Sequence, residues 1–375
     1  MPNNPATQLA PRNAALDGLR AVAALSVFGF HAWLYTLSTP RASFAPVSFL
    51  NDLFAQLRVG LVLFFVLTGF LLFRAWVRSG AAGGPAPANA TYAVHRIGRI
   101  VPAYWLAIIG SALALYPLAG SPGVRLPPAG LLPLFFIFAE NFNPQTLLTL
   151  DPPMWTLAVE ATFYLALPVL GWLALRAGRG RGTMTLVPLV LLAGGVIFNY
   201  VISLHGGGSP GWPKSLLAML PYFALGMLAA VIVEGRGLSR PSARIWVAVG
   251  VLLVVANVVV QIEAFDVLRV LRDLSAAVGF AIIVAVAALR PPKPLEWRPL
   301  VWIGGVSYGL YLWHVPVLLV LRADGLLPLN PWGATLVALP LSLLLGWMSL
   351  RLVEQPAMAW SRRTKLFGAN VSRSA

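Results

Sequence analysis

Long apolar runs recur along almost the whole chain, and they constrain its fold more than any other feature. Each run is about 20 residues long, which is the length a helix needs to cross the hydrocarbon core of a membrane. A segment inside lipid must also satisfy its own backbone hydrogen bonds, as a helix does. The sequence therefore predicts an all-α, polytopic membrane bundle of about ten helices. The expected spans are 14–36, 56–77, 98–119, 155–175, 184–204, 214–234, 244–262, 272–290, 300–322 and 333–353.

The composition agrees with a membrane location and argues against a nucleic-acid partner. Hydrophobic residues make up 58% of the chain and charged residues only 10%, whereas a soluble domain carries about 25% charged residues. A net charge of +15 would suggest nucleic-acid binding in a soluble protein. Here the cations lie in the breaks between apolar runs, where positive charge reports helix orientation. We expect the lipid bilayer as a partner and no nucleic acid.

The distribution of positive charge predicts the orientation of the bundle. With the N-terminus in the cytoplasm, 20 of the 27 lysines and arginines fall in cytoplasmic segments. Cytoplasmic loops carry such an excess, so we expect both termini inside and an even number of spans. Residues 1–13 then form a cytoplasmic segment, 14–356 the membrane domain and 357–375 a basic cytoplasmic tail. The N-terminus lacks the pattern of a cleavable signal peptide, so the first helix should be retained.

Two connecting segments have distinctive compositions. Residues 79–89 are rich in Gly, Ala and Pro and predict a flexible cytoplasmic linker. Residues 120–153 form a longer, proline-rich outer segment, for which a partial lid is one interpretation. Within it, the apolar run 131–138 is too short to cross and suits an interfacial or re-entrant piece.

The chain has no cysteine, which excludes disulfides, a thiolate nucleophile and cysteine metal ligands.

The first span carries the sequence LDGLRAVAALSVFGFHAW at residues 16–33. At ~100° per residue, Arg20 and His31 lie within about 20° of one face and roughly 16 Å apart along the axis. Asp17 is three residues before Arg20 and can pair with it on that face. An arginine that binds an anion and a histidine that handles a proton would then line one interior channel. Alternatively, Arg20 extends to lipid phosphates and His31 only packs between helices.

Two further arginines lie in the segment HRIGRIVPAYW, residues 95–105. Arg96 and Arg99 are one turn apart at the cytoplasmic start of a predicted helix. Guanidinium groups at this spacing suit phosphates, which they bind in bidentate fashion. Basic residues at a helix start also serve as ordinary cytoplasmic anchors, so both interpretations remain open.

Polar groups recur in two later spans, and each needs a partner within the bundle. Glu160 lies in WTLAVEATFYL and fits either a functional carboxylate or a structural ion pair. His314 lies in SYGLYLWHVP at a depth like that of His31, with Tyr308 and Tyr311 on its face. This second pattern also fits an aromatic packing stripe.

Structural roles suffice for two other features. Gly69, in GLVLFFVLTGFL, should allow close contact between helices. Arg351 and Glu354 have the spacing of an i,i+3 ion pair near the end of the last span. Pro356 would then end that helix.

Taken in order, these segments resemble acyltransferase family 3, a family of membrane O-acyltransferases. The resemblance covers about residues 16–356 and rests on LDGLR, Arg-x10-His, GLVLFFVLTGFL, HRIGRIVPAYW, WTLAVEATFYL, SYGLYLWHVP and a closing Glu-x-Pro. It implies transfer of an acyl group, usually acetyl from acetyl-CoA, to a hydroxyl of a sugar, glycolipid, peptidoglycan or polyketide macrolide. It also implies a multi-pass protein of the bacterial cytoplasmic membrane. Two departures are His95, where many members have a further arginine, and the lack of an appended extracellular esterase-like domain.

The resemblance carries roles to individual residues. His31 is the expected general base and Arg20 its motif partner, and Glu160 matches the motif glutamate. Arg96 and Arg99 match an Arg-x-x-Arg motif, which we assign to the phosphates of the donor. The donor is thus expected to be acyl-CoA, bound from the cytoplasm.

The remaining polar residues complete the predicted site. We expect Asp17, Tyr308 and His314 to contact the substrates, and we expect no metal. The alternative function is a transporter or flippase of a lipid-linked or amphipathic substrate, because intramembrane Arg, His and Glu also line permeation paths. Matched helix interruptions would favour transport, and the sequence has no convincing matched pair.

Overall fold

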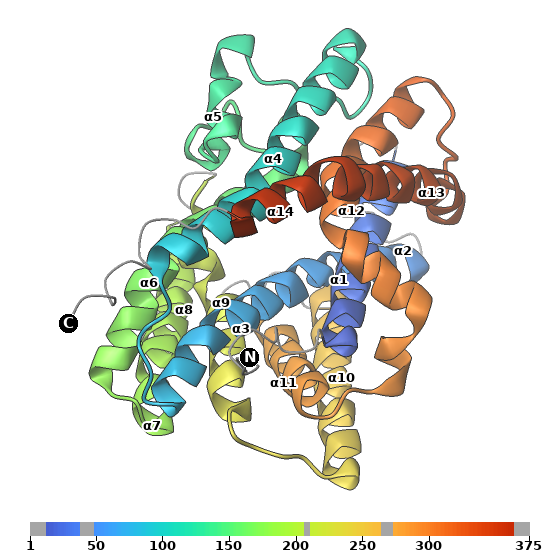
Figure 1. The fold of residues 1–375 in the computed structure, drawn as a ribbon. Coiled ribbons are helices and arrows are strands. Elements are labelled where there is room, and N and C mark those ends of the chain that lie inside the picture. The colour runs from blue at the N-terminus through green and yellow to red at the C-terminus, as the bar shows by residue number, and fades with distance from the viewer. Residues whose placement is uncertain (1–12, 38–48, 206–210, 264–272, 364–375) are drawn as a thin grey trace, which may run out of the picture.

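A computed structural model describes residues 13–37, 49–205, 211–263 and 273–363. In these ranges the structure is a bundle of helices without a β-strand (Figure 1). The long helices are α1 (Ala14–Leu34), α3 (Gly60–Ala81), α4 (Asn89–Leu115), α6 (Trp155–Ala177), α8 (Leu186–Leu204), α9 (Leu216–Val233), α10 (Arg240–Glu263), α11 (Leu274–Leu289), α12 (Arg298–Ala323) and α13 (Pro331–Ser349). The shorter ones are α2 (Phe49–Gln56), α5 (Pro133–Phe136), α7 (Arg181–Met184) and α14 (Gln355–Arg363).

The predicted all-α, polytopic membrane bundle is confirmed. The described residues contain nine helices that are long and apolar enough to cross a membrane. The tenth predicted span, 272–290, corresponds to α11, which has only 16 residues. At 1.5 Å per residue α11 covers about 24 Å, somewhat less than the ~30 Å hydrocarbon core. It packs along α10, α9 and α3 as part of the bundle.

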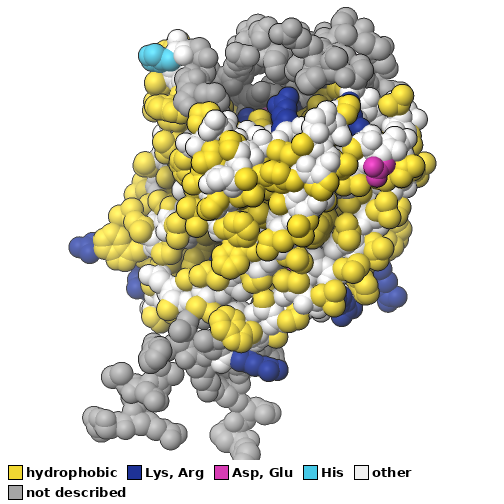
Figure 2. Space-filling view, turned by 90° about the horizontal axis from the view of Figure 1, so that it is seen from above, with side chains coloured by type: hydrophobic (Ala, Val, Ile, Leu, Met, Phe, Trp, Pro, Cys, Tyr) yellow, Lys and Arg dark blue, Asp and Glu magenta, His cyan; other side chains and the backbone are white. Residues whose placement is uncertain are grey.

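Buried helices form the centre of the bundle and apolar helices surround them. The apolar windows of α1, α3, α9 and α12 are mostly buried, whereas those of α8, α10 and α13 are mostly exposed. Figure 2 shows hydrophobic side chains across the middle of one face, with Lys and Arg mainly toward its margins. Lipid tails can cover such apolar surface without cost, so it needs no second protein layer.

Small residues bring the central helices into close contact. A Cβ added at Gly69 of α3 would lie 2.2 Å from the carbonyl oxygen of Phe223 in α9. Reciprocally, a Cβ at Gly226 of α9 would lie 2.0 Å from the carbonyl oxygen of Val66 in α3. The close helix contact predicted for Gly69 is therefore confirmed, and only glycine allows this approach of two backbones.

The connecting segments differ in part from the predictions. The linker is shorter than expected, since α3 continues to Ala81 and α4 begins at Asn89. The Ser79 hydroxyl donates to the carbonyl of Gly84 at 3.2 Å and thus ties the turn together. The apolar run 131–138 does not cross, as predicted, and forms the end of η5 (Ala129–Leu131) and the four-residue α5.

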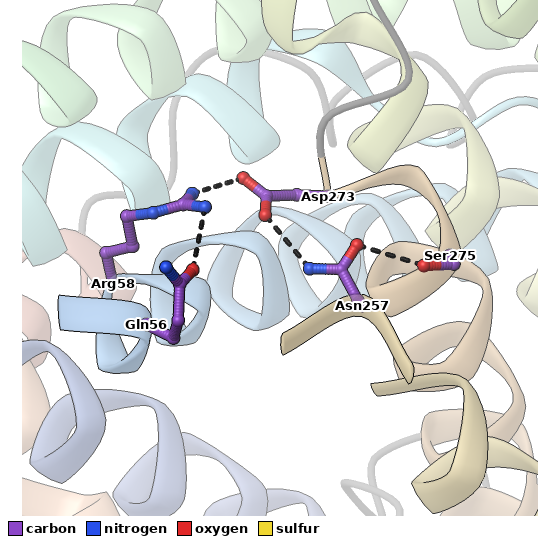
Figure 3. A network of polar contacts seen from close by, with 5 residues as sticks. All are labelled: Gln56, Arg58, Asn257, Asp273 and Ser275. Carbon is purple, nitrogen blue, oxygen red and sulfur yellow. Dashed lines mark hydrogen bonds and ion pairs between the residues drawn. The ribbon is translucent and has the colours of Figure 1, made fainter. Parts of the chain in front are cut away.

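A polar network joins α10 and α11 to the start of α3 (Figure 3). Arg58, in η3 (Leu57–Val59), forms an ion pair with Asp273 and donates to Gln56 at 3.0 Å. Asn257 of α10 donates to Asp273 at 3.1 Å and accepts from Ser275 of α11 at 2.9 Å. Asn257 and Asp273 are about 95% buried, so each needs these partners.

The last predicted span continues beyond its expected end. After α13 the chain forms a π-helical turn, η11 (Leu350–Glu354), and then α14. Helix α14 packs on α4 (Figure 1). The beginning of the predicted basic tail, residues 357–363, is therefore helical, while 1–12 and 364–375 lie outside the described residues.

Candidate active site

Helix α1 presents Arg20 and His31 to the interior of the bundle. Its first turn is capped by Asn13, whose side-chain oxygen accepts from the backbone N–H groups of Ala15 and Leu16. Arg20 lines a cavity of about 110 Å³ between the helices. His31, three turns further along, contacts α12. The predicted stripe with a cation and an imidazole therefore faces protein along its length.

His31 and His314 form a hydrogen-bonded pair between α1 and α12. Nδ1 of His31 lies 3.1 Å from Nε2 of His314 and 2.9 Å from the carbonyl oxygen of Val27. Nδ1 of His314 lies 2.7 Å from the carbonyl oxygen of Tyr311. The predicted similar depth of the two histidines is thereby confirmed, although 283 positions separate them in the chain.

The hydrogen bonds define the tautomer of each ring. A carbonyl can only accept, so Nδ1 of His314 carries the hydrogen and donates to Tyr311. The Val27 carbonyl can likewise only accept, so Nδ1 of His31 carries a hydrogen, which lies between the Val27 carbonyl and the acceptor Nε2 of His314. The lone pair of His31 therefore lies on Nε2, for which no described residue supplies a hydrogen bond. This nitrogen is the basic atom of the pair.

Aromatic rings fix the orientation of both histidines. Phe30 packs edge-on to His31, with ring centroids 4.9 Å apart, and the ring of Tyr35 stacks with that of His31 at 6.3 Å. Phe28 and Tyr311 pack against His314 at 6.1 and 5.6 Å. Rings held in this way lose little freedom when a substrate binds, which favours a defined direction for proton transfer.

The 110 Å³ cavity gathers three arginines. Arg20 of α1 and Arg96 and Arg99 of α4 all line it. The Arg96 guanidinium lies over the ring of Tyr164, 5.5 Å from its centroid. Arg99 interacts electrostatically with Arg20 and with Glu354. Three guanidinium groups around one cavity suit phosphates or another multiply charged anion.

Glu160 lies in the same cavity, opposite hydroxyl groups. Its carboxylate accepts from the Thr68 hydroxyl at 3.1 Å and from Tyr164. Both hydroxyls and Glu160 line the cavity. Glu160 also interacts electrostatically with Arg96 and Arg20. The carboxylate therefore compensates part of the arginine charge and holds Tyr164 in place.

Tyr311 connects the cavity to the histidine pair. It lines the cavity, and its ring contacts His314. Its hydroxyl lies 2.7 Å from the Thr156 hydroxyl and 3.0 Å from the carbonyl of Pro153. Neither His31 nor His314 lines the cavity itself. The pair thus lies one residue behind the cavity wall.

The three residues that were predicted to contact the substrates lie in three different places: the arginine cavity, the histidine pair and the start of α1. Tyr308 lines the cavity, and its hydroxyl donates to the carbonyl of Ile100 at 2.8 Å. His314 belongs to the histidine pair. Asp17 is buried at the start of α1, with its backbone against Gly304 of α12, and does not line the cavity. His95, where the family often has arginine, is exposed.

Glu354 was predicted to pair with Arg351, and this prediction is wrong. Arg351 is exposed and donates to Gln355 at 3.5 Å. Glu354 is 4% exposed, accepts from Ser349 at 3.4 Å and interacts with Arg99. The π-helical turn at 350–354 inserts one extra residue, which turns Glu354 into the bundle. The sequence feature that could have indicated a buried Glu354 is a carboxylate at the end of an apolar helix.

Two buried carboxyl groups of the segment 120–153 were also missed. Glu140, in η6 (Glu140–Phe142), and Asp151 are each 1% exposed. Tyr104 donates to Glu140 at 3.1 Å, and burial raises the pKa of Glu140 to about 8. Burial also raises the pKa of Asp151, whose two oxygens accept no hydrogen bond from a described residue. Proline-rich surroundings gave no sign that these acids are buried.

Comparisons with known proteins agree with these observations. The family model Acyl_transf_3, described as an acyltransferase domain, matches residues 13–351. Nodulation protein 10 of Rhizobium leguminosarum bv. viciae is 27% identical over 388 residues, which cover 95% of each chain. No solved structure is a significant match.

Two other similar proteins are named as O-acetyltransferases. The putative peptidoglycan O-acetyltransferase YrhL of Bacillus subtilis is 24% identical over 81% of this chain and 48% of its own length. The O-acetyltransferase OatA of Staphylococcus aureus is 22% identical over 91% of this chain and 56% of its own length. This chain thus spans about half the length of both.

The family match distinguishes the enzyme from the transporter that the sequence left as an alternative. It covers almost the whole helical bundle, including the motifs that bring the arginines and histidines inside. The chain belongs to acyltransferase family 3 and is a membrane-bound O-acyltransferase.

Proposed function

We propose that the protein transfers an acetyl group from acetyl-CoA to a hydroxyl of a sugar, glycolipid, exported glycan or macrolide-type metabolite. The observation that carries the proposal is the arrangement on α1: Arg20 in a cavity with two further arginines, and His31 in a hydrogen-bonded pair deeper in the bundle. The names of the similar O-acetyltransferases support acetyl as the acyl group.

The donor binds with its phosphates at the arginine cavity. Arg96 and Arg99 contact the phosphates in bidentate fashion, and Arg20 adds a third cation. Glu160 and Glu354 lie beside these arginines and hold them in position when the donor has left. The pantetheine arm then extends past Tyr308 and Tyr311 toward the histidine pair.

The acceptor hydroxyl is deprotonated by His31. Its proton passes to Nε2 of His31, the oxygen attacks the thioester carbonyl, and the carbon–sulfur bond breaks. The CoA sulfur leaves as a thiolate and takes the proton back from His31 to form the thiol. His314 accepts from Nδ1 of His31 throughout, which stabilises the imidazolium and keeps its ring oriented.

A radiolabel assay tests the proposal. Purified protein is incubated with labelled acetyl-CoA and a panel of hydroxyl-bearing acceptors. A histidine base supplies about 10²–10⁴-fold in rate, so His31→Ala should lose that factor in turnover while acetyl-CoA still binds. Full turnover of a folded His31→Ala variant would contradict the assignment. His205→Ala is the matched control, because His205 is exposed at the end of α8 and bonds only to the carbonyl of Val201 among the described residues.

The acceptor can be identified in cells. A strain without the protein should contain one glycan, lipid or secondary metabolite that is lighter by one acetyl group, detected by mass spectrometry. Unchanged acetylation combined with altered export of such a molecule would instead support a transporter.

A further inference from the structure

A second and larger cavity lies on the other side of α6. Its volume is about 430 Å³, within the range of small-molecule sites. Thr156 and Glu160 of α6 line the arginine cavity, whereas Ala158, Val159 and Thr162 line this second one. The other walls come from η6, from α8, and from η8 (Trp212–Lys214) with the start of α9. One helix thus separates two cavities.

The walls of the second cavity are mostly apolar and lie near the lipid-facing surface. Phe198 of α8 stacks on Trp212, with ring centroids 5.8 Å apart, and Leu216 and Leu217 continue the wall. Phe142 at the rim is 76% exposed. Because α8 is mostly exposed as well, a hydrocarbon chain can enter directly from the bilayer.

One end of the cavity is polar and incomplete. Asn141 lines it and is 8% exposed. Its amide nitrogen donates to the carbonyls of Trp155 at 2.7 Å and Lys214 at 3.0 Å. Its amide oxygen accepts no hydrogen bond from a described residue. A buried acceptor without a donor is costly, and Asn141 is one of the residues that line the cavity.

A cation lines the same cavity. The Lys214 side chain lines the cavity, and its ammonium lies over the ring of Trp155, 5.4 Å from the centroid. An ammonium group at the end of a membrane helix attracts anionic head groups, and Trp212 is of the type that anchors at the lipid–water interface. The polar end therefore combines a hydrogen-bond acceptor that lacks a donor among the described residues with a positive charge.

We propose that this cavity binds an anionic phospholipid whose head group carries free hydroxyls, as in phosphatidylglycerol. The phosphate lies at Lys214, a head-group hydroxyl donates to the Asn141 amide oxygen, and one acyl chain lies along Phe198 and Leu217. A zwitterionic choline lipid has neither the net charge nor the donor. The site is separate from the arginine cavity and does not depend on the proposed acetyl transfer.

Lipid binding to the purified protein tests this proposal directly. Native mass spectrometry measures the affinities for phosphatidylglycerol, phosphatidylmethanol and phosphatidylcholine with identical chains. Phosphatidylmethanol keeps the charge but has no hydroxyl. We expect phosphatidylglycerol to bind about fivefold more tightly than phosphatidylmethanol, the factor of one ordinary hydrogen bond. Phosphatidylcholine should bind most weakly.

Two variants separate the two contacts, and their melting temperatures show that they are folded. Lys214→Gln should weaken both anionic lipids about fivefold and leave phosphatidylcholine unchanged. Asn141→Leu should abolish the difference between phosphatidylglycerol and phosphatidylmethanol. Lys293→Gln, an exposed lysine in η10 (Lys293–Glu296), is the matched control.

Two outcomes would overturn the proposal. One is equal binding of the three lipids to the wild-type protein. The other is a preference for anionic lipids that Lys293→Gln reduces as much as Lys214→Gln does. Should Asn141→Leu fail to fold, Lys214→Gln with the same three lipids still decides whether the anionic site lies here.

Discussion

A neutral imidazole has one donor and one acceptor nitrogen, and the surroundings of His31 and His314 decide which nitrogen is which. The Tyr311 carbonyl requires a hydrogen on Nδ1 of His314. That choice makes Nε2 of His314 an acceptor for His31. The Val27 carbonyl requires a hydrogen on Nδ1 of His31 in the same way. His314 therefore helps to position His31, and the two backbone carbonyls together define Nε2 of His31 as the basic atom.

Substitutions of His314 should distinguish a role in positioning His31 from a role in binding acetyl-CoA. His314→Leu removes one of the two acceptors for His31 and leaves only the Val27 carbonyl, so we expect kcat to fall about 10²-fold. The KM for acetyl-CoA should stay unchanged, because His314 does not line the arginine cavity. His314→Gln can offer an amide oxygen to His31 and should recover much of kcat. Equal losses in the Leu and Gln variants would argue against this role.

Glu140 should make stability depend on pH. Burial raises its pKa from 4.5 to about 8, so the folded state prefers the protonated carboxyl group. Its contribution to the free energy of unfolding is complete below about pH 4.5 and is lost as the pH rises through about 8. Glu140→Gln cannot ionise. The melting temperature of this variant should match that of the wild type near pH 5 and exceed it at pH 9.

A matched acidic residue controls for general effects of charge. Glu296→Gln changes an exposed side chain in η10, and its difference from the wild type should not grow between pH 5 and pH 9. If Glu140→Gln behaves like Glu296→Gln, Glu140 does not hold its proton in the folded state.

Packing between elements depends on glycines that allow two helix backbones to approach. Helices α3 and α9 meet at Gly69 and Gly226, where the nearest backbone oxygen would lie only about 2 Å from an added Cβ. Backbone atoms cannot move aside as a flexible side chain can. The contact between α3 and α9 is therefore sensitive to a single methyl group.

The same substitution in two helices tests this sensitivity. Gly226→Ala should destabilise the bundle by about 1–3 kcal/mol, as overpacking does. Gly194→Ala in α8 should not destabilise it, because nothing lies within 4 Å of a Cβ at that position. Unfolding in a denaturing detergent, followed by loss of helical circular dichroism, measures both. Similar stability of the two variants would show that α3 can shift away from α9.

At the scale of the whole molecule, orientation decides which face of the membrane each substrate comes from. Twenty of the 27 basic residues fall in segments assigned to the cytoplasm. The short α11 matters here. The described residues contain nine other helices that can cross, so the number of crossings is even, with both termini on one side, only if α11 also crosses. Helix α11 packs along α10, a helix that is long enough to cross, which favours a full crossing.

Single cysteines can map the orientation, since the natural chain has none. Each variant is treated in intact cells with a maleimide that cannot cross the membrane. Pro122→Cys should react, whereas Ala86→Cys, Gly237→Cys and Lys293→Cys should react only after the cells are permeabilised. These positions are all exposed. Labelling of Lys293→Cys in intact cells, without labelling of Gly237→Cys, would show that α11 does not cross.

The predicted elements were largely correct because the membrane imposes a simple rule. A helix must be long and apolar enough to cross, and both properties appear in a single stretch of sequence. Nine of the ten expected spans correspond to helices that meet this rule in the described residues. The placement of Arg20 and His31 on one face also followed from local helix geometry, because both lie on one helix. The direction of that face into the bundle came from the tertiary structure.

The sequence alone thus determined the helices, their membrane location and the residues on each helix face, since all three depend on neighbours within a few turns. Tertiary structure decided which faces meet. It paired His31 with His314, turned Glu354 toward Arg99, and buried Glu140 and Asp151. These contacts depend on how glycine-lined helices pack across long stretches of chain, and no local periodicity in the sequence records that choice.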